Sequence, residues 1–137
     1  MSYDFITDQQ ASFEMIYVRL HHLPPLGYRI EGPYWKFLHD ETVAPIVKRI
    51  WAEALQGLSV RKITNLIEAE YQFRTPIRGK TGGRPLHRTT VNAILKDLFY
   101  AGYVRLGERI CKGLHEPFVS PEDFLRVQRQ LAKRQKN

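Results

Sequence analysis

Hydrophobic residues recur every three or four positions in five segments of the chain, and this spacing predicts amphipathic helices. The clearest segment covers residues 43–55, with Pro45 in its first turn and Gly57 placed to end it. Asp40 or Thr42 is placed to cap its start. The other helices are expected over residues 11–20, after a cap at Ser59, over residues 89–99, and after a cap at Ser120.

Two further segments combine β-prone residues with a central turn, a pattern that predicts β-hairpins. They cover residues 26–38, with Gly32-Pro33 between the strands, and residues 103–112, with Gly107 between them. The helices on either side of Gly57-Leu58 are joined so closely that they are expected to pack against each other. The predicted fold is therefore mainly α-helical with two small hairpins.

Size and composition indicate one globular domain. The 137 residues are enough for one hydrophobic core, and the 7 Tyr, 7 Phe and 2 Trp residues give that core large side chains. No apolar run approaches the roughly 18 residues of a membrane span, and residues 1–10 lack the pattern of a secretory signal. Because Cys111 is the single cysteine, no intrachain disulfide can form, and a reducing cytoplasm is the expected compartment.

The positive charge of the chain is unevenly placed. The net charge is +7, but residues 1–45 hold three basic and six acidic side chains, a balance of −3. The remaining residues hold eighteen basic and eight acidic side chains, a balance of +10, and residues 71–96 hold six basic residues and no acid. Such a concentrated positive field attracts phosphate backbones. A membrane surface fits less well, because this stretch is not an amphipathic helix.

Residues 71–88 contain three Gly and two Pro, which exclude a regular helix. The segment has two interpretations. As a solvated loop, its charges keep the protein soluble. As a DNA-binding arm, its flexible backbone follows a groove, and its Arg side chains suit a narrow minor groove. We favour the arm, because all charges from Arg74 to Arg88 have one sign, and we expect the segment to lack a fixed conformation without DNA.

The order of two helices, a loop, a third helix and a hairpin is typical of a winged helix-turn-helix-like DNA-binding domain. In such domains the helix after the turn enters the major groove, and a hairpin or arm reaches the DNA backbone. Here that helix covers residues 89–99. Its apolar stripe leaves Thr90, Asn92, Ala93 and Lys96 facing outward. Asn92 has the side chain that pairs with adenine, although it could also be an ordinary solvated residue. The residues expected to contact DNA are Arg74, Arg78, Lys80, Arg84, His87, Arg88, Thr90, Asn92 and Lys96.

Six short motifs follow one another along the chain: residues 24–28 (PPLGY), 41–51 (ETVAPIVKRIW), 57–63 (GLSVRKI), 74–76 (RTP), 90–102 (TVNAILKDLFYAG) and 115–128 (HEPFVSPEDFLRVQ). In this order and spacing they resemble the recombinase domain of large serine recombinases, over about residues 24–134. The chain departs from the family pattern in two places. Leu26 replaces a usual Tyr, and Leu86 and His87 lie where a Trp usually precedes the third helix.

The resemblance implies site-specific binding to part of a phage or transposon attachment site in duplex DNA. In this family a separate N-terminal domain carries the serine that cuts DNA, and a later zinc-binding domain adds contacts. The chain is therefore expected to be non-catalytic, with self-association only through domains it lacks. Residues 1–23 are interpreted as a connector remnant, residues 24–134 as the DNA-binding domain and residues 135–137 as a basic tail.

No cofactor or metal is expected. Ser59 and Ser120 are interpreted as helix caps, and the adjacent side chains of His21 and His22 diverge. Residues 79–81 (GKT) lack the upstream glycine of a phosphate-binding loop. His39 and His115 are expected at the surface or the edge of the core. Two other functions fit the same pattern, a stand-alone winged-helix transcriptional regulator and a protein-interaction module whose basic loop binds an acidic partner.

Overall fold

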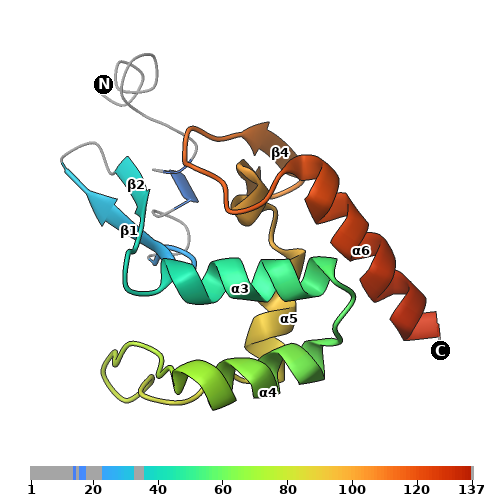
Figure 1. Ribbon diagram of the computed structural model, residues 1–137. Helices are drawn as coiled ribbons and strands as arrows, with labels where there is room; N and C mark the ends of the chain where they lie inside the picture. The colour runs from blue at the N-terminus through green and yellow to red at the C-terminus, as the bar shows by residue number, and fades with distance from the viewer. Residues whose placement is uncertain (1–13, 15, 18–22, 33–35, 137) are drawn as a thin grey trace, which may run out of the picture.

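The computed structural model describes residues 14, 16–17, 23–32 and 36–136 (Figure 1). Its elements are, in order, β1 (Tyr28–Glu31), β2 (Lys36–His39), α3 (Ala44–Leu55), α4 (Val60–Tyr71), α5 (Arg88–Lys96), the 3-10 turn η1 (Leu98–Ala101), β3 (Tyr103–Leu106), β4 (Arg109–Lys112) and α6 (Pro121–Lys136). The prediction of a mainly α fold with two small hairpins is confirmed. The helix predicted over residues 11–20 lies largely outside the described residues.

The first hairpin pairs β1 with β2 in antiparallel register, from Tyr28 opposite His39 to Glu31 opposite Lys36. Tyr28 and Phe37 are both buried, so one face of this small sheet packs on the core. The Tyr28 hydroxyl donates a hydrogen bond of 2.6 Å to the carbonyl of Glu116, which ties the hairpin to the segment before α6. Burial raises the pKa of the Tyr28 hydroxyl well above its usual value, so the group stays a donor.

The predicted cap of α3 is wrong. The helix follows Val43, and no side chain caps it. Asp40 Oδ1 instead accepts hydrogen bonds from the backbone N–H of Thr42 at 3.1 Å and from its hydroxyl at 2.8 Å, which closes a local turn before the helix. The C-terminal end of α3 agrees with the prediction that Gly57 ends the helix, because Gly57 takes a left-handed φ of +94° just after the last turn.

Helices α3 and α4 run in opposite directions, with α5 packed across them (Figure 1). Ser59 caps α4 as predicted, since its side chain accepts the backbone N–H of Lys62 at 3.2 Å. Helix α5 is shorter than the predicted 89–99 segment, because the backbone of Asp97 is extended and ends it. The Asp97 carboxylate then accepts the N–H of Phe99 at 3.0 Å and starts η1.

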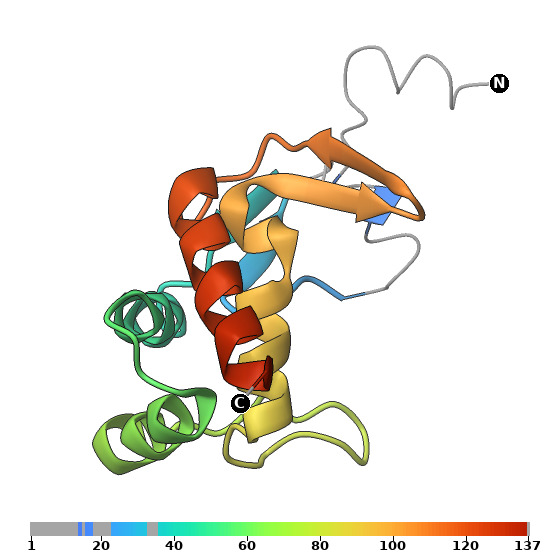
Figure 2. The same cartoon turned by 90° about the vertical axis from the view of Figure 1, so that its right-hand side faces the viewer.

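Helix α6 begins as predicted, because the Ser120 hydroxyl accepts the backbone N–H of Asp123 at 3.1 Å. It runs alongside α5 in the opposite direction (Figure 2), and the Gln128 side chain donates to the carbonyl of Leu95 at 2.5 Å. The second predicted hairpin is present as β3 and β4, paired from Tyr103 opposite Lys112 to Leu106 opposite Arg109. It lies at the end of the molecule where α5 finishes (Figure 2).

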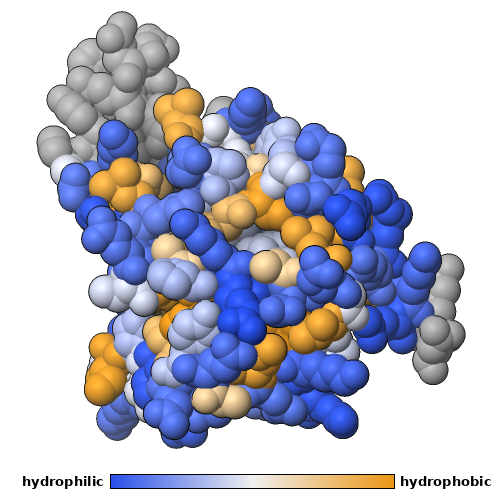
Figure 3. Space-filling model, in the orientation of Figure 1, coloured by the Kyte–Doolittle hydropathy of each residue, from blue (hydrophilic) through white to orange (hydrophobic). Residues whose placement is uncertain are grey.

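One hydrophobic core joins all four described helices to both hairpins. Its largest fully buried side chains include Trp51, Phe99 and Tyr100. On the face shown in Figure 3, hydrophobic residues form small patches separated by hydrophilic ones. No helix within the described part of the chain is long and apolar enough to cross a membrane.

The prediction that His115 lies at the surface or the edge of the core is wrong, because its side chain is fully buried. It forms an ion pair with the buried carboxylate of Glu14, and its ring stacks on that of Phe99 at a centroid distance of 3.8 Å. The pair joins residues 101 positions apart, so it fixes Glu14 to the loop before α6. No aspect of the sequence pattern indicated that these two residues meet.

Candidate nucleic-acid interface

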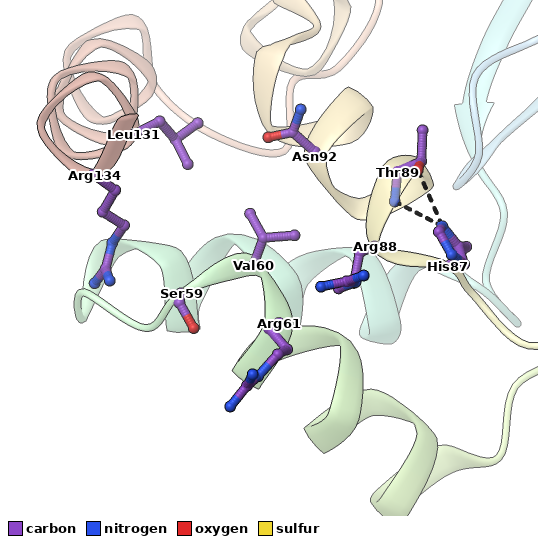
Figure 4. A pocket seen from close by; sticks show the side chains of 9 residues that line it. All are labelled: Ser59, Val60, Arg61, His87, Arg88, Thr89, Asn92, Leu131 and Arg134. Atoms are coloured by element: carbon purple, nitrogen blue, oxygen red, sulfur yellow. Dashed lines mark hydrogen bonds between the residues drawn. The ribbon is translucent and has the colours of Figure 1, made fainter. Parts of the chain in front are cut away.

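Helix α5 presents one polar, exposed face. Val91, Ile94 and Leu95 are buried, and they hold the helix against the core. The exposed positions are Arg88, Thr89, Thr90, Ala93 and Lys96, while Asn92 is half-buried at the edge of that face. The structure therefore places Thr90 and Lys96 in solvent, as predicted, and moves Asn92 toward the side on which α6 packs (Figure 4).

The first turn of α5 is held by His87. Its Nδ1 atom accepts the backbone N–H of Thr89 at 3.1 Å and lies 3.0 Å from the hydroxyl of the same residue. Because Nδ1 serves as an acceptor, the opposite ring nitrogen, Nε2, is the atom that can donate to a ligand. Thr89 was not among the residues predicted to contact DNA, although its exposed position on α5 places it beside them.

The basic loop, residues 72–87, is closed by hydrogen bonds within itself. At its base the backbone N–H of Thr75 donates to the carbonyl of Arg84 at 2.9 Å, and near its tip Arg78 and Thr81 exchange two backbone hydrogen bonds. Gly82 has a φ of +90°, and a Cβ atom there would lie 1.8 Å from the carbonyl oxygen of Pro76. Glycine is therefore required at this position for the loop to close.

The cations of this region differ in whether an acid neutralises them. The Arg74 guanidinium forms two hydrogen bonds, of 2.8 and 3.1 Å, with the carboxylate of Glu68, so α4 already holds it. No such acidic partner, within the part of the chain that the structure describes, faces the remaining predicted cations. These are Arg78, Lys80, Arg84, Arg88 and Lys96, all of them exposed.

A cavity of about 490 Å³ lies where the starts of α4 and α5 meet the end of α6 (Figure 4). Three arginines line it, Arg61, Arg88 and Arg134, each from a different helix. Its other lining residues are Ser59, Val60, His87, Thr89, Asn92 and Leu131. The sequence analysis missed Arg61 and Arg134, because nothing local in the sequence shows that these two helix ends converge on the start of α5.

The basic loop, the start of α5 and the end of α6 lie at one end of the molecule, away from the β3–β4 hairpin (Figure 2). The cavity is lined by residues of this end. The exposed Arg105 and Arg109 on that hairpin are therefore separated from the cations of the basic loop. The expectation that a hairpin following the third helix reaches a DNA backbone stays a prediction. Among the described residues, no three His, Cys, Asp or Glu side chains are grouped so that they could hold a metal ion.

The solved structures that share this fold include the following two. One is the crystal structure of an LSR–DNA complex, with a TM-score of 0.65 and 21% sequence identity, matched over 90% of this chain and 40% of the other. The second comes from work on the sequence requirements of the Listeria innocua prophage attP site, with a TM-score of 0.64 and 20% identity. That match covers 88% of this chain and 52% of the other. The chain thus spans about half or less of the length of these structures.

A comparison with curated proteins gave no match. The family model described as Recombinase, however, matches residues 41–134. These residues include helices α3 to α6, the basic loop, the cavity and the second hairpin. The match covers more than half of the chain, and the chain therefore belongs to the Recombinase family.

Proposed function

We propose that this chain binds duplex DNA at an attachment-type site, as the DNA-binding part of a site-specific serine recombinase. The observation that carries the proposal is the charge of one end of the molecule. There the exposed face of α5 lies beside the basic loop, and residues 71–96 include no acid. Family membership and the shared fold with an LSR–DNA complex support the same function.

In this proposal α5 enters the major groove with its exposed face toward the bases. Thr90 and Lys96 have side chains that hydrogen-bond base edges, and Asn92 has the donor and acceptor pair that matches adenine. Because Asn92 is half-buried, its amide has fewer accessible orientations, which favours a single defined contact.

The basic loop supplies the contacts that do not depend on sequence. Arg78, Lys80 and Arg84 project from a closed loop beside α5, and phosphate contacts of this kind fix the position of a protein on the duplex. Arg74 is bound to Glu68 and would have to exchange that partner for a phosphate, so we expect it to contribute less than the other cations.

We assign binding rather than DNA cleavage to this chain. The hydroxyls of Ser59 and Ser120 both accept backbone N–H groups at helix starts, which supports a structural role for each. The chain needs no cofactor for such binding, and we expect self-association to depend on other domains. Its single cysteine, the partly buried Cys111, fits a reducing cytoplasm, where we place this function.

Selection from randomised duplex DNA, followed by titrations at two salt concentrations, tests the proposal. We expect a defined motif, in which Asn92→Ala blurs one position and lowers the affinity for the preferred base by about 1–3 kcal/mol. Arg78→Ala should weaken binding to all sequences alike and reduce the salt slope by about one. Arg126→Ala, which removes an exposed arginine near the start of α6, is the matched control and should leave the slope unchanged.

The alternative functions predict different results. A protein-interaction module that binds an acidic partner would select no motif and would bind all duplexes weakly. A stand-alone transcriptional regulator would select a motif, and a gene for a serine catalytic domain beside this one would favour the recombinase. Absence of any motif, together with equal effects of Arg78→Ala and Arg126→Ala, would contradict the proposed function.

A further inference from the structure

The cavity between α4, α5 and α6 is lined by charges of a single sign. Arg61, Arg88 and Arg134 surround it, and no lining residue is acidic (Figure 4). The three arginines come from three helices that are far apart in the sequence, so the fold, and no local run of basic residues, brings them to one cavity.

Some arginines of this protein are neutralised by nearby acids. The partly buried Arg49 pairs with Glu53 at 2.7 Å, and the exposed Arg126 pairs with Asp123 at 3.2 Å. Arg61 and Arg88, in contrast, have no hydrogen bond or ion pair with any residue that the structure describes. Their fork-shaped donor groups are therefore available, and such groups match the oxygens of a phosphate.

The walls of the cavity are fixed by packing. Val60 and Leu131 are partly buried members of the hydrophobic core and close one side. The Arg134 guanidinium is bound to the carbonyl of Gly57, just past the end of α3, and this bond keeps α6 beside α4. The cavity also shares Thr89 and Asn92 with α5, so it adjoins the face that is proposed to enter the major groove.

We propose that this cavity binds one phosphate group of the DNA backbone, with Arg61 and Arg88 donating to its non-bridging oxygens. The inference rests on the proposed function and adds to it a contact outside α5 and the basic loop. A strand that borders the groove occupied by α5 would pass over the cavity, since the two share residues. The contact would fix the position of α5 along the groove. That position determines which base pairs the side chains of α5 contact.

Titration of the selected duplex at several salt concentrations tests this site. Arg61→Ala and Arg88→Ala should each lower the affinity about tenfold at low salt and reduce the salt slope by about one, as expected for one lost phosphate contact. Arg126→Ala on α6 removes the same charge at the other end of the molecule and should change neither the affinity nor the salt slope. All three residues are exposed, and equal melting temperatures would show that the variants are folded.

Replacement of single phosphates by neutral methylphosphonates then locates the contact. Replacement of one linkage should weaken binding of the unsubstituted protein, and the same replacement should have no further effect on the double variant Arg61→Ala/Arg88→Ala. If no linkage behaves in this way while the protein still binds its motif, the cavity proposal fails and the proposed function stands. If the unsubstituted protein binds no duplex, both fail.

The cavity is large enough for a free phosphorylated molecule, which is the second possible source of a phosphate. Titration with inorganic phosphate and with a mononucleotide, monitored by NMR of the Arg61 and Arg88 amides, distinguishes a phosphate of the DNA backbone from a free phosphorylated molecule. We expect only weak, salt-sensitive shifts from either compound. Tight binding of the mononucleotide that also displaces the duplex would overturn the assignment to the DNA backbone.

Discussion

At the scale of single residues, the buried Glu14 and His115 pair is the most unusual feature. Both ring nitrogens of His115 face acceptors, Nδ1 the Glu14 carboxylate and Nε2 the carbonyl of Phe99 at 2.6 Å. Burial raises the pKa of Glu14, but its hydrogen bonds with the side chain and backbone of His115 outweigh that effect and hold the pKa at about 2.

This lowered pKa predicts how stability depends on acid. A carboxyl whose folded pKa is depressed stabilises the protein above its ordinary pKa, here 4.5, and that stabilisation is lost as the pH falls toward about 2. We expect the free energy of unfolding to drop by about 3 kcal/mol across this range. In Glu14→Gln this part of the drop should be absent, and the variant should be less stable at neutral pH.

Urea denaturation at a series of pH values measures the effect. Glu41→Gln is the matched control, because Glu41 is exposed and shows no described ion pair, so it should follow the unsubstituted protein. An unchanged pH dependence in Glu14→Gln would show that the pair does not carry this stabilisation.

At the scale of elements, the conformation of the basic loop in the free protein determines how much of the proposed DNA-binding surface is already formed before DNA binds. Hydrogen bonds between Thr75 and Arg84 close its base, and those between Arg78 and Thr81 close its tip, yet Arg78 and Lys80 are exposed. We therefore expect trypsin to cut the free protein fastest after these two residues, since exposed loop tips are preferred cleavage sites. Bound duplex should slow the cuts in proportion to occupancy, as mass spectrometry of the fragments would show.

The same experiment has an internal control. Arg61 and Arg88 lie within helices, so cleavage after them should be slow with or without DNA. Protection of Arg78 and Lys80 in the free protein would contradict the expectation that the loop lacks a fixed conformation without DNA. Protection by an acidic polypeptide equal to that by the duplex would favour the protein-interaction alternative.

Local signals predicted most elements correctly. Ser59 and Ser120 cap α4 and α6 because each hydroxyl can reach a backbone N–H two or three residues later, a relation that the sequence shows directly. The prediction failed where two local structures compete. Asp40 bonds to Thr42 instead of capping α3, and Asp97 ends α5 by capping a 3-10 turn, although apolar residues continue at helical spacing.

The candidate site was less predictable than the fold. The exposed face of α5 follows from its own periodicity, so Thr90, Asn92 and Lys96 could be named in advance. Arg61 and Arg134 could not, because their position beside Arg88 depends on how α4, α5 and α6 pack. The bond between Arg74 and Glu68 depends on how the chain folds back after α4, and no periodicity shows it.

At the scale of the whole molecule, the two ends differ in the elements that could contact DNA. The basic loop, the start of α5 and the cavity gather at one end, and the β3–β4 hairpin lies at the other (Figure 2). A duplex bound by α5 through its first turns would therefore not reach the hairpin. This differs from a winged arrangement, in which the hairpin beside the third helix contacts the backbone.

NMR titration of the protein with its selected duplex decides between these arrangements. We expect amide shifts at residues 58–62, 76–96 and 131–134, and none beyond small effects at residues 103–112. Repeating the titration at high salt should remove the shifts at residues 76–88 first, because phosphate contacts weaken most with salt. Shifts at Arg105 and Arg109 as large as those at the start of α5 would show instead that the hairpin acts as a wing. The duplex would then lie along the length of α5 rather than across its first turns.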